Sequence, residues 1–131
     1  MKDEQALVAV VDDDTRVLKA LRRLLETAGL NVSTYSTGAG FINDISMHQP
    51  DCVVLDLHMP EMNGFAVQEE LAGRAIPVPV IVITGHDSPE ARDRVMRQGA
   101  KAYLCKPVDD EELLDAIKHA VNRGSQGDEH T

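Results

Sequence analysis

Polar residues that could bind a phosphoryl group follow four short runs of branched apolar residues. Asp12 to Asp14 come after the first of these runs, Asp56 after another, and Thr84 and Lys106 after two more. Carboxylate oxygens suit Mg²⁺, which usually keeps several waters in proteins and shares its site with a phosphoryl group. Asp56 is a carboxylate able to form an acyl phosphate, while Thr84 can donate a hydrogen bond and Lys106 supplies a positive charge. These residue types together predict a magnesium-dependent phosphoryl site.

The mutual repulsion of the carboxylates supports this prediction. Clustered carboxylates cost free energy unless a cation lies among them or one of them binds a proton. A single acidic residue at the end of an apolar run is more often a loop residue that faces water. Because polar residues of complementary types follow four separate runs, we favour a site over a set of unrelated loop residues.

The elements that must position these residues alternate along the chain. Runs rich in branched residues predict five strands, at residues 6–11, 31–35, 51–55, 78–83 and 102–105. The segments between the runs carry apolar residues at the spacing of a helix face. This alternation predicts an α/β protein with a doubly wound, five-stranded parallel sheet. In such sheets the binding site lies beyond the carboxyl ends of the strands, which is where the polar residues fall.

The predicted helices differ in how clearly the sequence marks them. The apolar residues of segment 17–28 fall on one face, Asp14 is suited to cap its start, and Gly29 is suited to end it in a left-handed conformation. Weaker patterns predict helices around residues 41–45, 65–71 and 95–96. In the last helix, the apolar face covers residues 113–121 and the acidic residues 109–112 occupy the first turn, where the helix dipole favours them.

Length and composition fit one domain. The 131 residues are 43% hydrophobic and only 3% aromatic, so Val, Leu and Ile must build the core. We predict that residues 1–122 form this domain. The polar residues 123–131 lose the helical period and are predicted to form a frayed tail or the stump of a linker.

The charge and the hydropathy exclude several classes of function. The formal net charge of −9 repels phosphate backbones, which argues against direct nucleic-acid binding by this chain. The longest apolar runs fall far short of the roughly 20 residues of a membrane span. The acidic N-terminus lacks the pattern of a signal peptide. These features predict a cytoplasmic protein without a membrane span.

At the level of motifs, the sequence resembles the receiver domain of two-component response regulators over about residues 6–121. The stretches that carry the resemblance are VVDDD at residues 10–14, VVLDLHMPEMNG at 53–64, IVITG at 81–85 and GAKAYLCKP at 99–107. The resemblance implies a flavodoxin-like fold of five strand–helix units with strand order 2-1-3-4-5. The stretches around Asp56 and Thr84 are most similar to receivers that precede a helix-turn-helix output module, which implies a role in transcription regulation.

The same resemblance implies a signalling function. A sensor histidine kinase or a phosphotransfer protein would donate the phosphoryl group from a phosphohistidine to Asp56, with Mg²⁺ as cofactor, and the domain would then change conformation to control an output or partner. Such a domain is not an enzyme in the usual sense. It catalyses its own phosphotransfer and its slow self-dephosphorylation.

The roles of the individual residues follow residue by residue from the family motifs. Asp56 becomes the phosphoacceptor and a metal ligand. The resemblance makes Asp13 a direct Mg²⁺ ligand and Asp12 a ligand that acts largely through water. His58 would contribute only its backbone carbonyl to the metal.

Residues at further family positions would bind the phosphoryl group and transmit the conformational change that follows phosphorylation. Lys106 would pair with Asp56 and the phosphoryl oxygens, and Thr84 would bond a phosphoryl oxygen. Tyr103 occupies the switch-aromatic position and would turn from an exposed to a buried position as Thr84 moves inward. Pro107 is a candidate for a cis peptide bond with the residue before it. The face that includes residues 91–98 and 102–118 would report the change, as a homodimer contact or as a contact with an output domain.

Two histidines occupy positions that vary within the family and bear on the lifetime of the phosphoryl group. These are His58, two residues after Asp56, and His86, two residues after Thr84. We predict that they tune self-dephosphorylation, either by steric cover against attacking water or by a change of charge near neutral pH. The alternative is that both are solvated loop residues without kinetic effect.

A different class of protein also fits part of the pattern. Asp12 and Asp14 match the Asp-x-Asp motif of haloacid-dehalogenase-like phosphatases, in which Asp12 would be the nucleophile and Asp14 the general acid. Two features argue against a phosphohydrolase of this kind. No acidic pair follows a strand after Lys106, and 131 residues leave no room for the usual cap.

The two cysteines are predicted to be structural. Cys52 and Cys105 stand in apolar surroundings and lack the spacing of a zinc site or a redox pair, so we expect both to be buried. With the family strand order, the fourth strand lies between them, and their backbones would be about 10 Å apart at roughly 4.8 Å per strand. A disulfide tolerates at most about 7 Å between Cα atoms, so we predict no bond.

Overall fold

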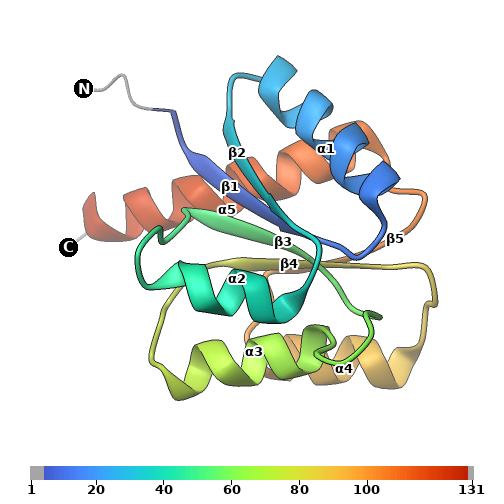
Figure 1. The fold of residues 1–131 in the computed structure, drawn as a ribbon. Helices are drawn as coiled ribbons and strands as arrows, with labels where there is room; N and C mark the ends of the chain where they lie inside the picture. Colours follow the sequence, from blue (N-terminus) through green and yellow to red (C-terminus); the bar gives the residue numbers. More distant parts are fainter. Residues whose placement is uncertain (1–4, 130–131) are drawn as a thin grey trace.

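Five strands alternate with five helices in the computed structural model, which describes residues 5–129 of the chain and the side chains of residues 5–122 (Figure 1). The elements are β1 (Leu7–Val11), α1 (Thr15–Thr27), β2 (Asn31–Tyr35), α2 (Gly38–Ile45), β3 (Cys52–Asp56), α3 (Gly64–Gly73), β4 (Val80–Thr84), α4 (Pro89–Arg97), β5 (Ala102–Cys105) and α5 (Asp110–Glu129). All five predicted strands are present.

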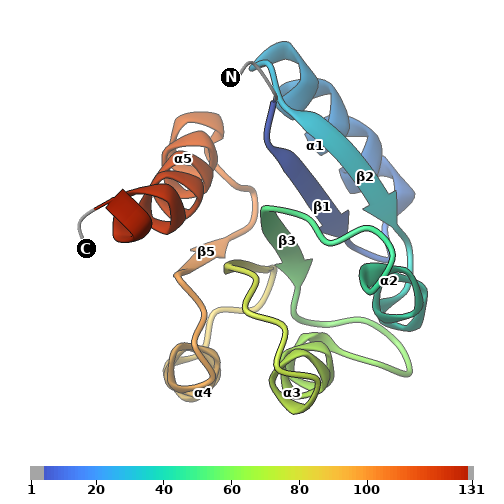
Figure 2. The ribbon, with the colours of Figure 1, turned by 90° about the vertical axis from the view of Figure 1, so that its left-hand side faces the viewer.

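The strands form one parallel sheet in the order β2-β1-β3-β4-β5. In the register of the sheet, Val10 on β1 lies opposite Thr34 on one side and Val54 on the other. Helices α1 and α5 cover one face of the sheet, and α2, α3 and α4 cover the other (Figure 2). The predicted doubly wound architecture and its strand order are therefore confirmed.

Each face of the sheet carries its own hydrophobic core. On β3, Cys52 and Val54 pack into the core beneath α1 and α5, while Val53 and Leu55 pack into the core beneath α2, α3 and α4. Every residue of β3 and β4 is buried. This burial on both sides explains why these two strands appear in the sequence as almost continuous apolar runs.

The structure shifts some of the predicted boundaries. Strand β4 begins at Val80 rather than at residue 78, because Pro79 lacks the N–H group that strand pairing needs. Helix α1 has the predicted ends: Asp14 accepts a hydrogen bond from the Arg16 N–H, and Gly29 follows the helix with a φ of +89°. Helix α5 continues to Glu129, beyond the predicted end of the domain at residue 122. The division at that residue stays a prediction.

The two cysteines differ in their surroundings. Cys52 is buried as predicted, but the expectation of burial was wrong for Cys105, which is exposed. The reason is position: Cys105 is the last residue of β5, an edge strand, and apolar neighbours in the sequence do not cover the end of an edge strand. Strand β4 lies between them, and both thiols are free, as predicted.

Within residues 5–129, none of the helices combines the length and the apolar character that a membrane span requires.

Gly64 allows α3 to begin directly against the end of β3. A Cβ atom at this position would lie 2.9 Å from the carbonyl oxygen of Asp56 and 2.9 Å from the Cα atom of Leu57. Because these neighbours are backbone atoms, we expect Gly64→Ala to destabilise the protein by about 2 kcal/mol, measured by urea unfolding.

Gly73, in the same helix, provides the matched control. A Cβ atom there meets nothing within 4 Å, so Gly73→Ala should be neutral or slightly stabilising because alanine favours the helix. Equal effects of the two substitutions would show that the close approach at Gly64 does not limit stability.

Candidate metal and phosphoryl site

The parallel sheet brings the predicted site residues to one edge. Asp12 follows β1, Asp56 ends β3, Thr84 ends β4, and Lys106 follows β5. Since all strands run in the same direction, their carboxyl ends meet at the same edge of the sheet (Figure 1). The predicted site residues at the ends of these four strands are thus neighbours in space.

Three carboxylates form the acidic part of this site. One ligand oxygen each from Asp12, Asp13 and Asp56 lies within 4.8 Å of the others. The Asp12 side chain is fully buried and Asp56 is 3% exposed, whereas Asp13 is exposed. A set of hard oxygen donors that is closed on the protein side and open toward solvent suits Mg²⁺, which keeps several of its waters. The donor set therefore fits the predicted ion.

Lys106 lies between the two buried carboxylates. Its Nζ atom is 3.0 Å from Asp12 Oδ2 and 3.2 Å from Asp56 Oδ1. The other oxygen of Asp12 accepts a hydrogen bond from the backbone N–H of Asp14 at 2.8 Å. Asp12 is therefore held at both oxygens, and its position is fixed before any ligand binds.

The charges of this cluster shift the proton affinities of its members. The pKa of Asp56 is raised from 3.8 to about 6, mainly by burial and then by the neighbouring charge of Asp12, while Lys106 acts in the opposite direction. Burial alone would lower the pKa of Lys106, but the hydrogen bonds and charges of Asp12 and Asp56 raise it overall. The ammonium group is thus held in its charged form, and the cluster contains more negative charge than one lysine balances.

Thr84 is buried beside this cluster, but its hydroxyl group is bonded within its own loop. The Oγ1 atom accepts a hydrogen bond from the backbone N–H of His86 at 3.0 Å and donates to the carbonyl of His86 at 3.3 Å. The carbonyl of Thr84 accepts from the Lys106 N–H at 2.7 Å, and the Lys106–Pro107 peptide bond that follows is cis. These contacts join the ends of β4 and β5.

The two histidines of the predicted entrance contact each other. The rings of His58 and His86 have their centroids 5.3 Å apart and meet edge to face, with an angle of 70° between their planes. Both side chains are exposed. The motifs predict that each histidine lies beside the site, but no pattern in the sequence indicates that the two rings contact each other.

Tyr103 takes the inward of the two positions that the sequence predicts for it. Its side chain is 7% exposed, and its hydroxyl oxygen accepts a hydrogen bond from the backbone N–H of Ser88 at 3.1 Å. The guanidinium group of Arg92 lies 5.5 Å from the ring centre. Ser88 and Arg92 were not among the predicted site residues.

A helix-start signal in the sequence could have drawn attention to Ser88. A serine followed by a proline is a typical beginning of a helix, and Ser88 caps α4 with Pro89 as the next residue. The contact between Arg92 and Tyr103 has no such signal, because it joins a helix to a strand.

The fold and the site define a class: flavodoxin-like α/β domains with a carboxylate and lysine site at the carboxyl edge of the sheet. Within that class, residues 8–118 match the response regulator receiver domain, so the chain belongs to the receiver domain family of response regulators. Nothing in the similarities to known proteins supports the alternative of a haloacid-dehalogenase-like phosphohydrolase.

Individual relatives agree with this assignment. The chain is 36% identical over 130 residues to the response regulator protein TmoT of Ectopseudomonas mendocina, a match that covers 99% of this chain and 59% of TmoT. The structure of the response regulator StyR has a TM-score of 0.87 at 35% identity, covering 97% of this chain and 64% of StyR.

A solved structure of similar length also matches. The response regulator receiver protein from Burkholderia phymatum has a TM-score of 0.80 at 41% identity and covers 90% of this chain and 96% of its own. By contrast, the chain spans less than two thirds of the length of TmoT and of StyR.

Proposed function

We propose that Asp56 accepts a phosphoryl group from a phosphohistidine of a sensor histidine kinase or a phosphotransfer protein. One Asp56 oxygen attacks the phosphorus atom, the bond between phosphorus and the imidazole nitrogen breaks, and the imidazole leaves with the electron pair. The observation that carries this proposal is the position of Asp56: a buried carboxylate, 3.2 Å from the Lys106 ammonium, within a cluster whose donors fit Mg²⁺.

The residues around Asp56 supply the charge and the orientation that the transfer needs. Asp12, Asp13, Asp56 and the backbone carbonyl of His58 would hold Mg²⁺, which neutralises charge on the transferring group when it is bound. Lys106 already lies beside Asp56 and would bond a phosphoryl oxygen from there. Thr84 would exchange its hydrogen bonds within the loop for one to the phosphoryl group.

In this proposal the exchange of bonds by Thr84 moves the loop that leads to α4. The backbone N–H of Ser88, which begins that helix, is the group that holds the hydroxyl of Tyr103. A shift of the loop would therefore change the balance between the inward and outward positions of Tyr103, as a two-state element.

The face formed by α4, β5 and α5 would report the change to a homodimer partner or to an output domain. Arg92 of α4 lies beside Tyr103 of β5, and Asp110, Glu111 and Glu112 form the first turn of α5. A second copy of the chain in two-fold symmetry could match Arg92 to this acidic turn. The relatives TmoT and StyR, both response regulators longer than this chain, support a regulatory role.

Removal of the metal tests the proposal directly. Incubation with Mg²⁺ and a small-molecule phosphodonor is expected to give a single phosphoryl adduct by intact mass spectrometry, and excess EDTA is expected to abolish it because the carboxylates then repel the donor. Peptide mapping of the adduct should place it on Asp56. An adduct on Asp12, or one that forms equally well in EDTA, would contradict the proposed acceptor.

The lifetime of the phosphoryl group provides a separate prediction. The rings of His58 and His86 contact each other. If they flank the entrance for attacking water, as the sequence predicts, removal of either ring should open that entrance. We expect His58→Ala and His86→Ala each to lose the phosphoryl group about two- to tenfold faster, since the lost cover is a small contact of about 0.5–1.5 kcal/mol. Decay of the phosphoprotein is followed by intact mass between about pH 6 and pH 8.

The double variant distinguishes shared cover from independent effects. If the two rings act as one cover, the double variant should decay no faster than the faster single variant. Decay at the wild-type rate in all three variants would show that the histidines are solvated loop residues without kinetic effect.

A further inference from the structure

The loops that follow β3 and β4 bring two histidine rings into contact. His58 lies two residues beyond the end of β3, and His86 lies two residues beyond the end of β4. These strands are neighbours in the sheet, and the Leu57 N–H continues their pairing by donating to the carbonyl of Ile83 at 3.0 Å. The two loops therefore leave the sheet side by side. Both rings are exposed, so solvent and dissolved ions can reach them.

The backbone of each histidine is held in place by its neighbours. His58 stands between Leu57 and Met59, which are 0% and 8% exposed. The backbone N–H and carbonyl of His86 bond the Thr84 hydroxyl group at 3.0 Å and 3.3 Å. Since these contacts use only main-chain groups of His86, they leave its imidazole ring outside the arrangement. A site built on such ordered positions loses little entropy when a ligand binds.

The distance between the rings is close to the one that a shared metal ion requires. The centroids of the His58 and His86 rings are 5.3 Å apart. Two imidazoles that bind one tetrahedral Zn²⁺ at about 2.0–2.1 Å have ring centres roughly 5 Å apart. Exposed side chains rotate readily, so each ring can direct one nitrogen atom at a common ion without movement of the backbone.

The ligand chemistry of this pair differs from that of the carboxylates. Imidazole nitrogen suits Zn²⁺, Cu²⁺ and Ni²⁺, whereas Mg²⁺ prefers oxygen ligands and keeps its waters. The acidic cluster of Asp12, Asp13 and Asp56 lies at the same edge of the sheet and carries more negative charge than one lysine balances. This charge attracts cations to the edge, and the ligand type then determines which ion the histidines hold.

From this geometry we propose that His58 and His86 together bind one divalent transition-metal ion, Zn²⁺ or an ion of similar ligand preference. One nitrogen atom of each ring binds the ion, and water molecules occupy the remaining positions. The ion joins the loop after β3 to the loop after β4. This site is separate from the Mg²⁺ site and does not depend on phosphorylation, so a failure of the phosphoryl-uptake experiment leaves it untouched.

Zinc chloride is the probe, and the unphosphorylated full chain is titrated with it in excess Mg²⁺, which occupies the acidic cluster. The titration is done at about pH 7.5, above the reference pKa of histidine, because metal ligands must be deprotonated. We expect the tightest site to bind one ion per chain by calorimetry. In ¹H–¹⁵N spectra of the imidazole groups, the ring signals of His58 and His86 should shift saturably with the same affinity.

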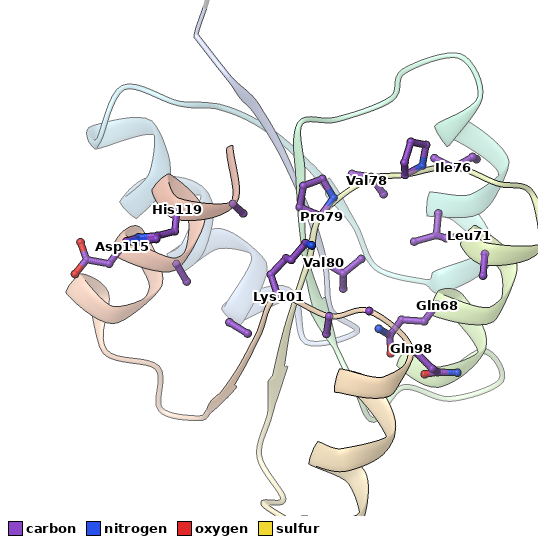
Figure 3. Close-up of a pocket in the computed structure, with 17 residues that line it drawn as sticks. Gln68, Leu71, Ile76, Val78, Pro79, Val80, Gln98, Lys101, Asp115 and His119 are labelled. Carbon is purple, nitrogen blue, oxygen red and sulfur yellow. The ribbon is translucent and has the colours of Figure 1, made fainter. Parts of the chain in front are cut away.

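Variants of single residues test the assigned ligands. His58→Ala and His86→Ala should each weaken binding of Zn²⁺ by about 10²-fold, because the second imidazole binds an ion that the first already holds. His119→Ala is the matched control, since it also removes one exposed histidine. His119 lies on α5 beside the groove at the amino ends of β4 and β5, away from the proposed site (Figure 3), so its loss should leave the affinity unchanged.

A fourth variant separates the histidines from the acidic cluster. Asp13→Asn changes an exposed member of that cluster, and it should not alter the affinity for Zn²⁺ in excess Mg²⁺. Loss of affinity in Asp13→Asn with retention in both His58→Ala and His86→Ala would place the ion on the carboxylates. An equal loss in His119→Ala, or shifts of only one of the two ring signals, would also overturn the shared site.

Discussion

The Asp56→Asn variant is expected to take up no phosphoryl group and, without Mg²⁺, to be more stable than the wild type near neutral pH. Loss of uptake follows from the loss of the nucleophilic carboxylate. The gain in stability follows from the pKa of Asp56, which burial and then the charge of Asp12 raise from 3.8 to about 6. An asparagine of the same shape carries no charge at any pH.

The sign of the stability change follows from linkage. Because the folded state binds the proton of Asp56 more tightly than the unfolded state, the protein loses stability as the pH rises from about 4 to about 6, and the loss is complete above pH 6. The shift, in which the opposing effect of Lys106 is already included, corresponds to about 3 kcal/mol. We therefore expect a gain of up to about 3 kcal/mol for Asp56→Asn near pH 7.5.

Urea unfolding of both proteins in EDTA measures this gain across the pH range. It should shrink progressively below about pH 6, and added Mg²⁺ should cancel it by stabilising the wild type. A gain of equal size at about pH 4 and pH 7.5 would mean that ionisation of Asp56 is not its cause.

The Lys106→Met variant is expected to lose most of its phosphoryl uptake and, in EDTA, to be less stable. Methionine preserves much of the volume of the lysine side chain but leaves the carboxylates of Asp12 and Asp56 without their cation. Removal of one partner of a buried ion pair typically costs 3–5 kcal/mol, and we expect about 2 kcal/mol because the lysine is 26% exposed. Uptake should fall by about 10²-fold or more, as for the loss of one preorganised donor to a charged transition state.

Lys118→Met is the control for the charge itself. Lys118 is exposed on α5, so its replacement changes the net charge by the same amount without reaching the carboxylates. If Lys118→Met reduced uptake as strongly as Lys106→Met, the effect would come from net charge rather than from the pairing of Lys106 with Asp12 and Asp56.

Much of the fold was predictable because the relevant signals are local. A strand that is buried on both faces must be apolar at every position, and β3 and β4 show this pattern directly. The site was predictable for a related reason: parallel strands bring their carboxyl ends to one edge, so residues that follow the strands meet regardless of their separation in the sequence.

Side-chain contacts between elements were not predictable in the same way. The inward position of Tyr103 depends on a hydrogen bond to Ser88 from another element, and the contact of His58 with His86 depends on the shapes of two loops. Neither leaves a periodic signal in the sequence. The exposure of Cys105 was not predicted, because the apolar residues beside it in the sequence do not show that the end of an edge strand is accessible to solvent.

The difference between the two thiols makes the natural chain suitable for selective labelling. Cys52 is fully buried, and burial raises the pKa of its thiol to about 12, so a maleimide dye or a nitroxide reagent would not reach it in the folded protein. Cys105 is exposed at the end of β5, directly before Lys106. A fluorophore or spin label at Cys105 would therefore report spectroscopically on the surface beside Tyr103. Such labelling needs no engineered cysteine, and Cys52 does not have to be replaced.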